Sequence, residues 1–309
     1  MKIIFFGSDD FAAVHLEALI KGKHSLVAVV TPPDKARGRG MKTQPGPVKD
    51  LAQQHKIALL QPENVNDDQA IKKLKSFNAD LFVVIAYGKI LSQAVLDLPK
   101  IMPINVHSSL LPKYRGAAPI NWAIIHGETL TGVSIIKMSK RMDAGDIVAQ
   151  LEVAISDRIT AQDLRQKMME VSPAFLIKTI GLIEKGEFLL ETQDEAKVSL
   201  APKLTKELGE IDWSRPAVEI RNLIRGLQPW PGAYTKFRGK MLKILAADVD
   251  VEASGKPGQI LSAGKEGILI AAGKQALNVK GVHLESSKPM SAGEFIIGHK
   301  ISADERLGV

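Results

Sequence analysis

The chain has 309 residues, of which 45% are apolar and 24% charged, and its 41 Lys and Arg against 34 Asp and Glu give a net charge of +7. Because a typical domain has about 150 residues, this length predicts two domains with sizeable cores. The composition is ordinary for a soluble globular protein, and the absence of cysteine excludes disulfides, thiolate metal sites and cysteine nucleophiles.

Residues 1–8 indicate a first core strand and not a targeting segment, because the apolar run is very short and acids follow it directly. The longest apolar runs, such as 81–86, have the length of strands and fall far short of the about 20 residues that span a bilayer. We therefore expect a reducing, cytoplasmic location and no membrane contact. The net charge alone fits a polyanionic partner and plain solubility equally well.

Up to about residue 185, short β-branched runs alternate with amphipathic stretches. We expect strands at 2–7, 25–31, 57–61, 80–87, 104–107 and 132–138 and helices at 11–21, 47–55, 69–77, 89–98 and 118–126. This alternation predicts an α/β domain with a Rossmann-like, mostly parallel twisted sheet and flanking helices. Ligands of such sheets bind beyond the carboxyl ends of the strands. At the first of these ends Ser8 or Asp9 is expected to cap the next helix, and the lack of a G-x-G-x-x-G motif disfavours a dinucleotide.

A long helical pattern covers 160–185, as one helix or as two joined near Pro173. Thr160 is its expected N-cap and Gly186 its expected stop.

The polar segment 188–206 has few large apolar residues and reads as a linker. A helix at 217–226 and short strands separated by glycines follow it, which predicts a small, OB-like β-barrel. We thus expect a first domain at 1–187 and a second at 207–309.

Three candidate reactive side chains lie at and after the expected strand 104–107. Alternate residues of a strand share a face, so Asn105 and His107 point the same way. A carboxamide can stabilise an oxyanion and an imidazole can move a proton, which suits acyl transfer with the substrate's own amine as nucleophile. Asp143 could orient and ionise the histidine or take a proton from the nucleophile. Taken singly, each of the three fits a structural role better.

Together they stand in segments that resemble a known signature, 105–116 (NVHSSLLPKYRG) and 142–146 (MDAGD). These segments resemble the folate-dependent formyltransferases. The blocks 6–13 (FGSDDFAA), 86–91 (AYGKIL) and 228–233 (QPWPGA) extend the resemblance to the methionyl-tRNA formyltransferase family over nearly the whole chain.

The resemblance implies transfer of a formyl group from 10-formyltetrahydrofolate to the α-amino group of methionyl-initiator tRNA, for translation initiation. It implies that Asn105 holds the formyl oxygen, that His107 polarises it or moves a proton, and that Asp143 is the partner on the base side. No metal, no nicotinamide cofactor and no obligate protein partner is expected. The folate-binding residues that it implies are Ala86, Tyr87, Gly88, Ser109, Leu110, Leu111 and Pro112. A plain strand end would explain Tyr87 equally well.

Two basic segments are candidates for RNA contact. The segment 34–42 has four basic residues, one acid and two glycines, and a flexible basic loop can follow a phosphate backbone. On its residues alone a solvated loop is the simpler reading, but it resembles the family's tRNA-contacting insertion, with Arg39 in the matching place. From 220 to 247 six basic residues and no acid are interleaved with aromatics, although Trp230, between two prolines, is expected to pack. The candidate tRNA-binding residues are Arg37, Arg39, Lys42, Arg221, Arg225, Lys236, Arg238 and Lys240.

Other functions stay open on the sequence. A sugar-nucleotide N-formyltransferase would use the same three residues and folate pocket without needing a basic loop, and a formyl-folate hydrolase is a further rival. An RNA-binding protein without catalysis is disfavoured by the intact trio, and an NAD-dependent dehydrogenase by the missing glycine motif.

Overall fold

The computed structural model describes residues 1–34, 36–37, 42–43, 46–303 and 305–308. It divides into two compact units. The first comprises Met1–Gly116, Gly132–Val153 and Gln166–Leu200, and the second comprises Ala117–Thr131, Ala154–Arg165 and Ala201–Val309. The domain boundary at 188–206 stays a prediction from the sequence. Among the described residues, no helix combines the length and the apolar character needed to cross a membrane.

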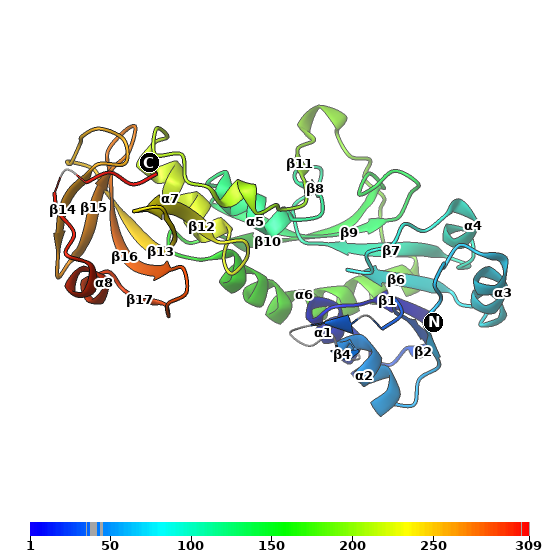
Figure 1. Ribbon diagram of the computed structural model, residues 1–309. Coiled ribbons are helices and arrows are strands. Elements are labelled where there is room, and N and C mark those ends of the chain that lie inside the picture. The colour runs from blue at the N-terminus through cyan, green and yellow to red at the C-terminus, as the bar shows by residue number, and fades with distance from the viewer. Residues whose placement is uncertain (35, 38–41, 44–45, 304, 309) are drawn as a thin grey trace. The chain divides into compact units, whose positions relative to one another are not determined.

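A seven-stranded sheet in the order β10-β9-β7-β6-β1-β2-β5 forms the centre of the first unit (Figure 1). Neighbours from β7 to β5 pair in parallel, and β9 runs antiparallel to β7. The predicted α/β fold with a mostly parallel sheet is therefore confirmed, and β1, β6 and β7 end at the same edge. The strands are β1 (Lys2–Gly7), β2 (Ser25–Val30), β5 (Leu59–Leu60), β6 (Leu81–Ile85), β7 (Met102–His107), β9 (Leu130–Lys137) and β10 (Ile147–Ala154).

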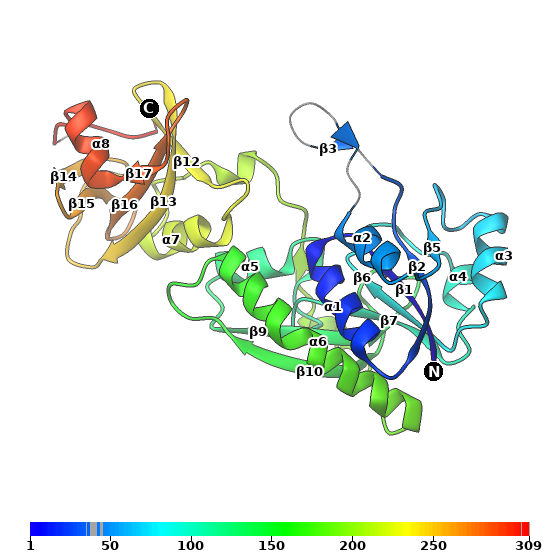
Figure 2. The same cartoon turned by 90° about the horizontal axis from the view of Figure 1, so that it is seen from below.

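Helices flank this sheet, with α1 and α6 on one face (Figure 2). Asp9 caps α1 by accepting a hydrogen bond from the N–H of Ala12 at 2.9 Å. Thr160 caps α6, where its hydroxyl accepts from the N–H of Asp163 at 3.2 Å, and Gly186 follows the last turn at φ +73°. Both caps match the predictions. The helices are α1 (Asp10–Lys21), α2 (Pro47–Gln54), α3 (Asp68–Ser76), α4 (Gln93–Leu96) and α6 (Ala161–Lys185), with short strands β3 (Ala36–Arg37), β4 (Lys42–Thr43) and β8 (Arg115–Gly116) and the 3-10 helix η1 (Glu195–Lys197).

The helix expected at 89–98 is wrong at its start, because α4 begins only at Gln93. The chain before it is irregular. Lys89 donates to the carbonyl oxygens of Pro62 (3.1 Å) and Glu63, and the side chain of Asn66 donates to the carbonyl of Ile90 (2.9 Å).

The core of the first unit lies on both faces of the sheet. Ile3, Ile4, Phe5 and Phe6 on β1 are completely buried, as expected for a parallel strand covered on both sides. On one face Phe6 packs on Phe82, with ring centroids 5.1 Å apart. Burial of one such side chain stabilises the fold by about 1.5–3 kcal/mol.

The second unit contains an antiparallel sheet in the order β12-β13-β16-β15-β14, with β17 paired to β16. Apolar side chains from these strands and from α7 and α8 form one core that includes Ile220, Ile244, Leu277 and Phe295. A separate C-terminal β-sheet was thus correctly predicted. The elements are α5 (Pro119–Ile125), β11 (Leu200–Ala201), η2 (Glu207–Gly209), α7 (Ala217–Gly226), β12 (Ala233–Phe237), β13 (Lys240–Asp250), β14 (Ile260–Gly264), β15 (Gly267–Ala271), β16 (Ala276–Leu284), β17 (Met290–Ser291) and α8 (Ala292–His299).

Candidate active site

The candidate site lies at the carboxyl ends of β6 and β7. Asn105 pairs with Val84 of β6, and His107 is the last residue of β7. The end of β1 is adjacent, because the Ser8 hydroxyl donates to the carbonyl oxygen of Ala86 at 2.6 Å. Three strand ends therefore meet where a ligand of a parallel sheet is expected.

His107 is 6% exposed and is held at one ring nitrogen. Its Nε2 lies 2.9 Å from the carbonyl oxygen of Tyr114. A carbonyl only accepts, so in the neutral ring Nε2 carries the hydrogen and Nδ1 has the free lone pair. Nδ1 faces Oδ1 of Asp143 at 3.7 Å. This is the atom at which the imidazole can take up a proton.

Asp143 is held in an unusual backbone conformation, with φ +51°. Its Oδ2 accepts a hydrogen bond from the N–H of Gly116 at 2.9 Å. The turn that follows is tight, because a Cβ at Gly145 would lie 1.7 Å from the carbonyl oxygen of Lys137. The loop thus presents one carboxylate oxygen to His107 and binds the other to the backbone.

Asn105 is half-buried, and its carboxamide has no hydrogen-bond partner in the described part of the chain. It lies two residues before His107 on the same face of β7. The structure therefore brings His107 and Asp143 together and leaves a nearby amide donor available to a ligand.

The predicted folate segment 86–88 offers backbone more than side chains. Ala86 and Gly88 are exposed, with φ +46° and +75°. The ring of Tyr87 is 2% exposed and meets Phe6 edge-on, with centroids 5.6 Å apart. Burial raises the pKa of the Tyr87 hydroxyl to about 12. The Tyr87 side chain therefore belongs to the core, and only its main chain can contact a ligand at this edge.

The predicted segment 109–112 is fixed by Ser134 of β9, which the sequence did not single out. The Ser134 hydroxyl donates to the carbonyl of Ser109 at 2.7 Å and accepts from the N–H of Leu111 at 3.0 Å. Gln150 donates to the carbonyl of Leu111 at 2.9 Å. Leu110 and Pro112 are half-buried. A flat ligand would meet a rigid main-chain wall here.

A cavity of about 220 Å³ opens beside the segment 86–88 and is lined by Ser8, Thr31, Pro32, Pro33, Asp34, Gly46, Lys49, Tyr87, Gly88 and Lys89. Lys49 ion-pairs with Asp34 at 2.5 Å, and its hydrogen bond holds the pKa of the Asp34 carboxyl below the usual value. Polar groups of both signs thus face a space next to the strand ends.

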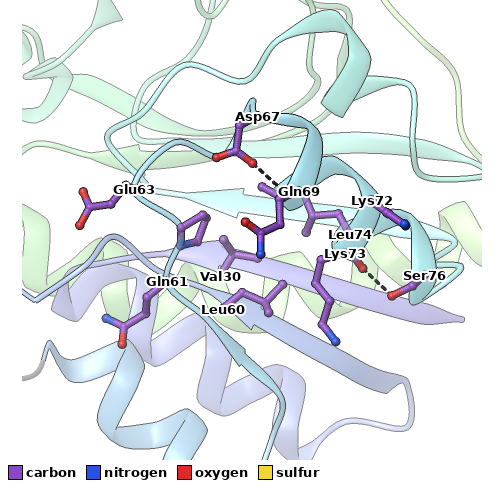
Figure 3. A pocket seen from close by; sticks show the side chains of 12 residues that line it. Val30, Leu60, Gln61, Glu63, Asp67, Gln69, Lys72, Lys73, Leu74 and Ser76 are labelled. Carbon is purple, nitrogen blue, oxygen red and sulfur yellow. Dashed lines mark hydrogen bonds between the residues drawn. The ribbon is translucent and has the colours of Figure 1, made fainter.

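A second cavity, of about 760 Å³, lies between α3 and the end of β5 (Figure 3). Val30, Leu60 and Leu74 supply apolar lining, and Lys72 and Lys73 come from α3. It contains none of the residues predicted for the site. Across the described residues as a whole, no group of three or more His, Asp or Glu side chains is placed to hold a metal ion.

The predicted tRNA-binding residues fall into different environments. Arg37 and Lys42 belong to β3 and β4, which pair antiparallel, and Arg39 lies outside the described residues. Lys236 and Lys240 are exposed on β12 and β13.

The three predicted arginines of the second unit are engaged within that unit. Arg221 forms a bidentate pair with Asp157, at 2.7 and 3.0 Å. Arg225 is 9% exposed and donates to the carbonyl of Ile159 at 2.9 Å and to Asn222 at 2.8 Å. Arg238 pairs with Glu305 at 2.7 Å.

Trp230 was expected to pack, and this expectation is wrong, because its side chain is 49% exposed. The neighbouring Pro231 carbonyl accepts from Lys243 at 3.0 Å, so the main chain beside the ring is anchored while about half of Trp230 stays exposed.

Comparison with known proteins identifies the family. Residues 1–180 match the family described as "Formyl transferase" and residues 203–300 match "Formyl transferase, C-terminal domain". The methionyl-tRNA formyltransferase of Caldanaerobacter subterraneus subsp. tengcongensis is 46% identical over 304 residues, which cover 97% of this chain and 98% of that protein. That of a Sulfurihydrogenibium species is 46% identical over 310 residues, with 99% and 100% covered.

Solved structures with this fold are more distant in sequence. An N-formyltransferase from Helicobacter canadensis, in complex with folinic acid and dTDP-3-aminofucose, has a TM-score of 0.67 at 19% identity and covers 94% of this chain and 100% of that chain. HypX from Aquifex aeolicus, in complex with tetrahydrofolic acid, has a TM-score of 0.63 at 19% identity, covering 97% of this chain and 47% of that chain. On the full-length relatives and the two matched regions, the chain belongs to the methionyl-tRNA formyltransferase family of the formyl transferases.

Proposed function

We propose that this chain transfers the formyl group of 10-formyltetrahydrofolate to the α-amino group of methionine on initiator tRNA. The observation that carries the proposal is the open Nδ1 of His107, which faces Asp143 at 3.7 Å. On the same face of β7, the Asn105 amide has no hydrogen-bond partner among the described residues. Relatives named methionyl-tRNA formyltransferase that match over the whole chain support this acceptor. The reaction belongs in the cytoplasm, where initiator tRNA is used.

The proposed reaction needs two groups that act on the formyl carbonyl and the amine. The amine nitrogen bonds to the formyl carbon, the bond from that carbon to the folate nitrogen breaks, and one proton passes from the amine to that nitrogen. The Asn105 amide donates to the developing oxyanion, an interaction that is strongest in the transition state.

His107 is the proposed proton carrier, through Nδ1. The carbonyl of Tyr114 holds the other nitrogen, so the ring cannot turn that nitrogen to the substrate without losing a buried hydrogen bond. One oxygen of Asp143 accepts the N–H of Gly116, and the other faces Nδ1, where it lies opposite the second N–H of the protonated ring.

The folate is proposed to lie against 86–88 and 109–112. The exposed main chain at Ala86 and Gly88 and the pinned segment from Ser109 to Pro112 fit a flat, hydrogen-bonding ring system. In the reaction the folate is the formyl donor, and its nitrogen is the leaving group. The predicted folate-binding role of Tyr87 is retained for its main chain only.

The tRNA is proposed to contact basic residues of the segment 34–42 and exposed basic residues of the predicted second domain, 207–309. Arg37, Arg39 and Lys42 are the candidates in the first, and Lys236 and Lys240 in the second. For Arg221, Arg225 and Arg238, whose side chains bind acids and carbonyls of the second unit, we propose an indirect role in holding that unit's surface.

Formylation assays with three acceptors test the proposed function. We expect activity with initiator methionyl-tRNA and little with elongator methionyl-tRNA. An amino-sugar nucleotide is the third acceptor, because the Helicobacter canadensis neighbour was solved with one. Turnover of the sugar alone would overturn the tRNA acceptor and favour the sugar N-formyltransferase alternative. No transfer to any acceptor, with retained tRNA binding, would favour an RNA-binding protein.

A further inference from the structure

The segment that carries Gln193 crosses the base of the Asp143 loop within the first unit. Ile147 and Glu191 exchange two backbone hydrogen bonds, at 2.8 and 2.9 Å, which fixes the segment beside the start of β10. The Thr192 hydroxyl adds a hydrogen bond to Asp146 at 3.1 Å. Gln193 follows and is only 6% exposed.

The Gln193 carboxamide uses both of its ends inside the protein. Its Nε2 donates to the carbonyl oxygen of Asp143 at 2.8 Å and to that of Gly145 at 2.7 Å. Its Oε1 accepts from Nε and Nη2 of Arg115, at 3.0 and 2.8 Å. Arg115 is buried, and the next residue, Gly116, donates its N–H to the Asp143 carboxylate at 2.9 Å.

These contacts close a ring that begins and ends at Asp143. Gln193 holds the main chain of Asp143, and Arg115 links Gln193 to the peptide that holds the Asp143 side chain. A left-handed conformation costs a residue such as Asp143 roughly 1–2 kcal/mol, so it persists only where surrounding contacts determine it. Gln193 supplies two of those contacts, and both accepting carbonyls belong to the loop.

We propose that Gln193 is a positioning residue for Asp143, which acts by fixing the carboxylate opposite Nδ1 of His107. This inference rests on the proposed function. Gln193 touches no reacting atom, and its effect on turnover passes through Asp143 alone.

Two substitutions separate this role from support of Arg115. Gln193→Glu keeps the side-chain shape and an oxygen for the Arg115 guanidinium, but places a second acceptor against the two loop carbonyls. If Gln193 served only Arg115, the glutamate would be as good as or better than glutamine. If it positions Asp143, Gln193→Glu is impaired like Gln193→Leu. Gln166→Leu, on the exposed surface of α6, is the matched control.

We expect both Gln193 variants to lower kcat by about 10–100-fold, since a small misplacement of a reacting group has effects of that size. KM for initiator methionyl-tRNA should change by less than about twofold, because tRNA contacts are untouched. Hydrogen exchange in a peptide covering 139–147 should accelerate in Gln193→Glu. A wild-type kcat in Gln193→Glu, in folded protein, would overturn the inference.

A double-mutant cycle with Asp143→Asn gives the decisive result. If Gln193 acts through Asp143, adding Gln193→Glu to Asp143→Asn costs little further activity, whereas an independent structural effect would multiply the two losses. Multiplied losses would overturn the inference while leaving the proposed function intact. Failure of the unaltered protein to formylate any acceptor would instead overturn the proposed function, and this inference with it.

Discussion

Nδ1 of His107 and Oδ1 of Asp143 lie 3.7 Å apart, which is too long for a hydrogen bond and short enough for an ion pair. The neutral ring, with its hydrogen on Nε2, has no N–H that faces Asp143. The protonated ring has a second N–H, on Nδ1, which faces the Asp143 carboxylate. The Asp143 carboxylate is therefore placed to face the second N–H that the ring carries once it has taken up a proton during transfer.

His107→Ala should lower kcat by about 10²–10⁴-fold, because the proposed proton carrier is removed. Affinity for initiator methionyl-tRNA should stay unchanged, since the ring is buried and faces Asp143 and Tyr114. Single-turnover formylation together with filter binding measures both quantities. Near-normal turnover would remove His107 from the mechanism.

Asn105→Ala should lower kcat by about 10²–10³-fold, as loss of one oxyanion donor does. Its effect on stability should stay below about 1 kcal/mol, because the amide has no hydrogen-bond partner among the described residues. Turnover and urea unfolding of the same preparations test the two statements. A large loss of stability with normal kcat in the folded fraction would assign Asn105 to the fold.

Gly145→Ala should destabilise the first unit and reduce turnover, because the added methyl would lie 1.7 Å from the carbonyl of Lys137. Overpacking of this kind costs about 1–3 kcal/mol or more. Gly181→Ala is the matched control, since Gly181 lies in α6 with nothing within 4 Å of the new methyl. That control should stabilise by about 0.4–1 kcal/mol. Thermal melts of both variants test this prediction. Similar melting temperatures for the two variants would contradict the predicted clash at residue 145.

His15 should make the fold sensitive to acid. Burial lowers its pKa from 6.5 to about 4, and its Nδ1 lies 2.7 Å from the carbonyl of Phe11. The pKa is depressed in the folded state, so the stabilisation is complete above pH 6.5 and is lost as the pH falls from 6.5 towards 4. The full loss corresponds to about 3 kcal/mol. His15→Met should flatten the pH dependence of the urea midpoint in that window, and an unaltered dependence would assign it to other groups.

Arg225→Met and Lys240→Ala remove the same charge and should have opposite effects. Arg225 is buried against the carbonyl of Ile159 and the amide of Asn222, so its loss should cost about 1–3 kcal/mol of stability and little tRNA affinity. Lys240 is exposed, and its loss should spare stability and lower the salt dependence of tRNA binding by about one ion. Equal effects on tRNA binding would show that net charge alone matters.

Local patterns predicted the parts of the fold that depend on neighbours in sequence. The caps at Asp9 and Thr160 follow from one side chain and the helix that comes next. The same logic could have found α8, which was not predicted, because Ser291 and Glu294 form a reciprocal cap. The helix α4 begins later than predicted, and Lys89, the predicted start, binds carbonyls 26 and 27 residues earlier in the chain.

The site was predictable only where its residues are close in the chain. Asn105 and His107 follow from strand alternation, whereas the contact of Gln193 with Asp143 spans 50 residues and that with Arg115 spans 78. No periodicity encodes such contacts. The prediction for Trp230 was wrong for a related reason. The local sequence of an aromatic residue between two prolines is the same whether its side chain is buried or exposed.

The exposed segment 86–88 has a consequence for inhibition. Ala86 and Gly88 are exposed and Gly88 lines the cavity, whereas the ring of Tyr87 turns into the core beside Phe6. A compound that binds the peptide groups of this segment would recognise atoms that every amino acid carries. Resistance would have to arise by moving the backbone itself, and a substitution that does so at Gly88, where φ is +75°, would strain the fold as well.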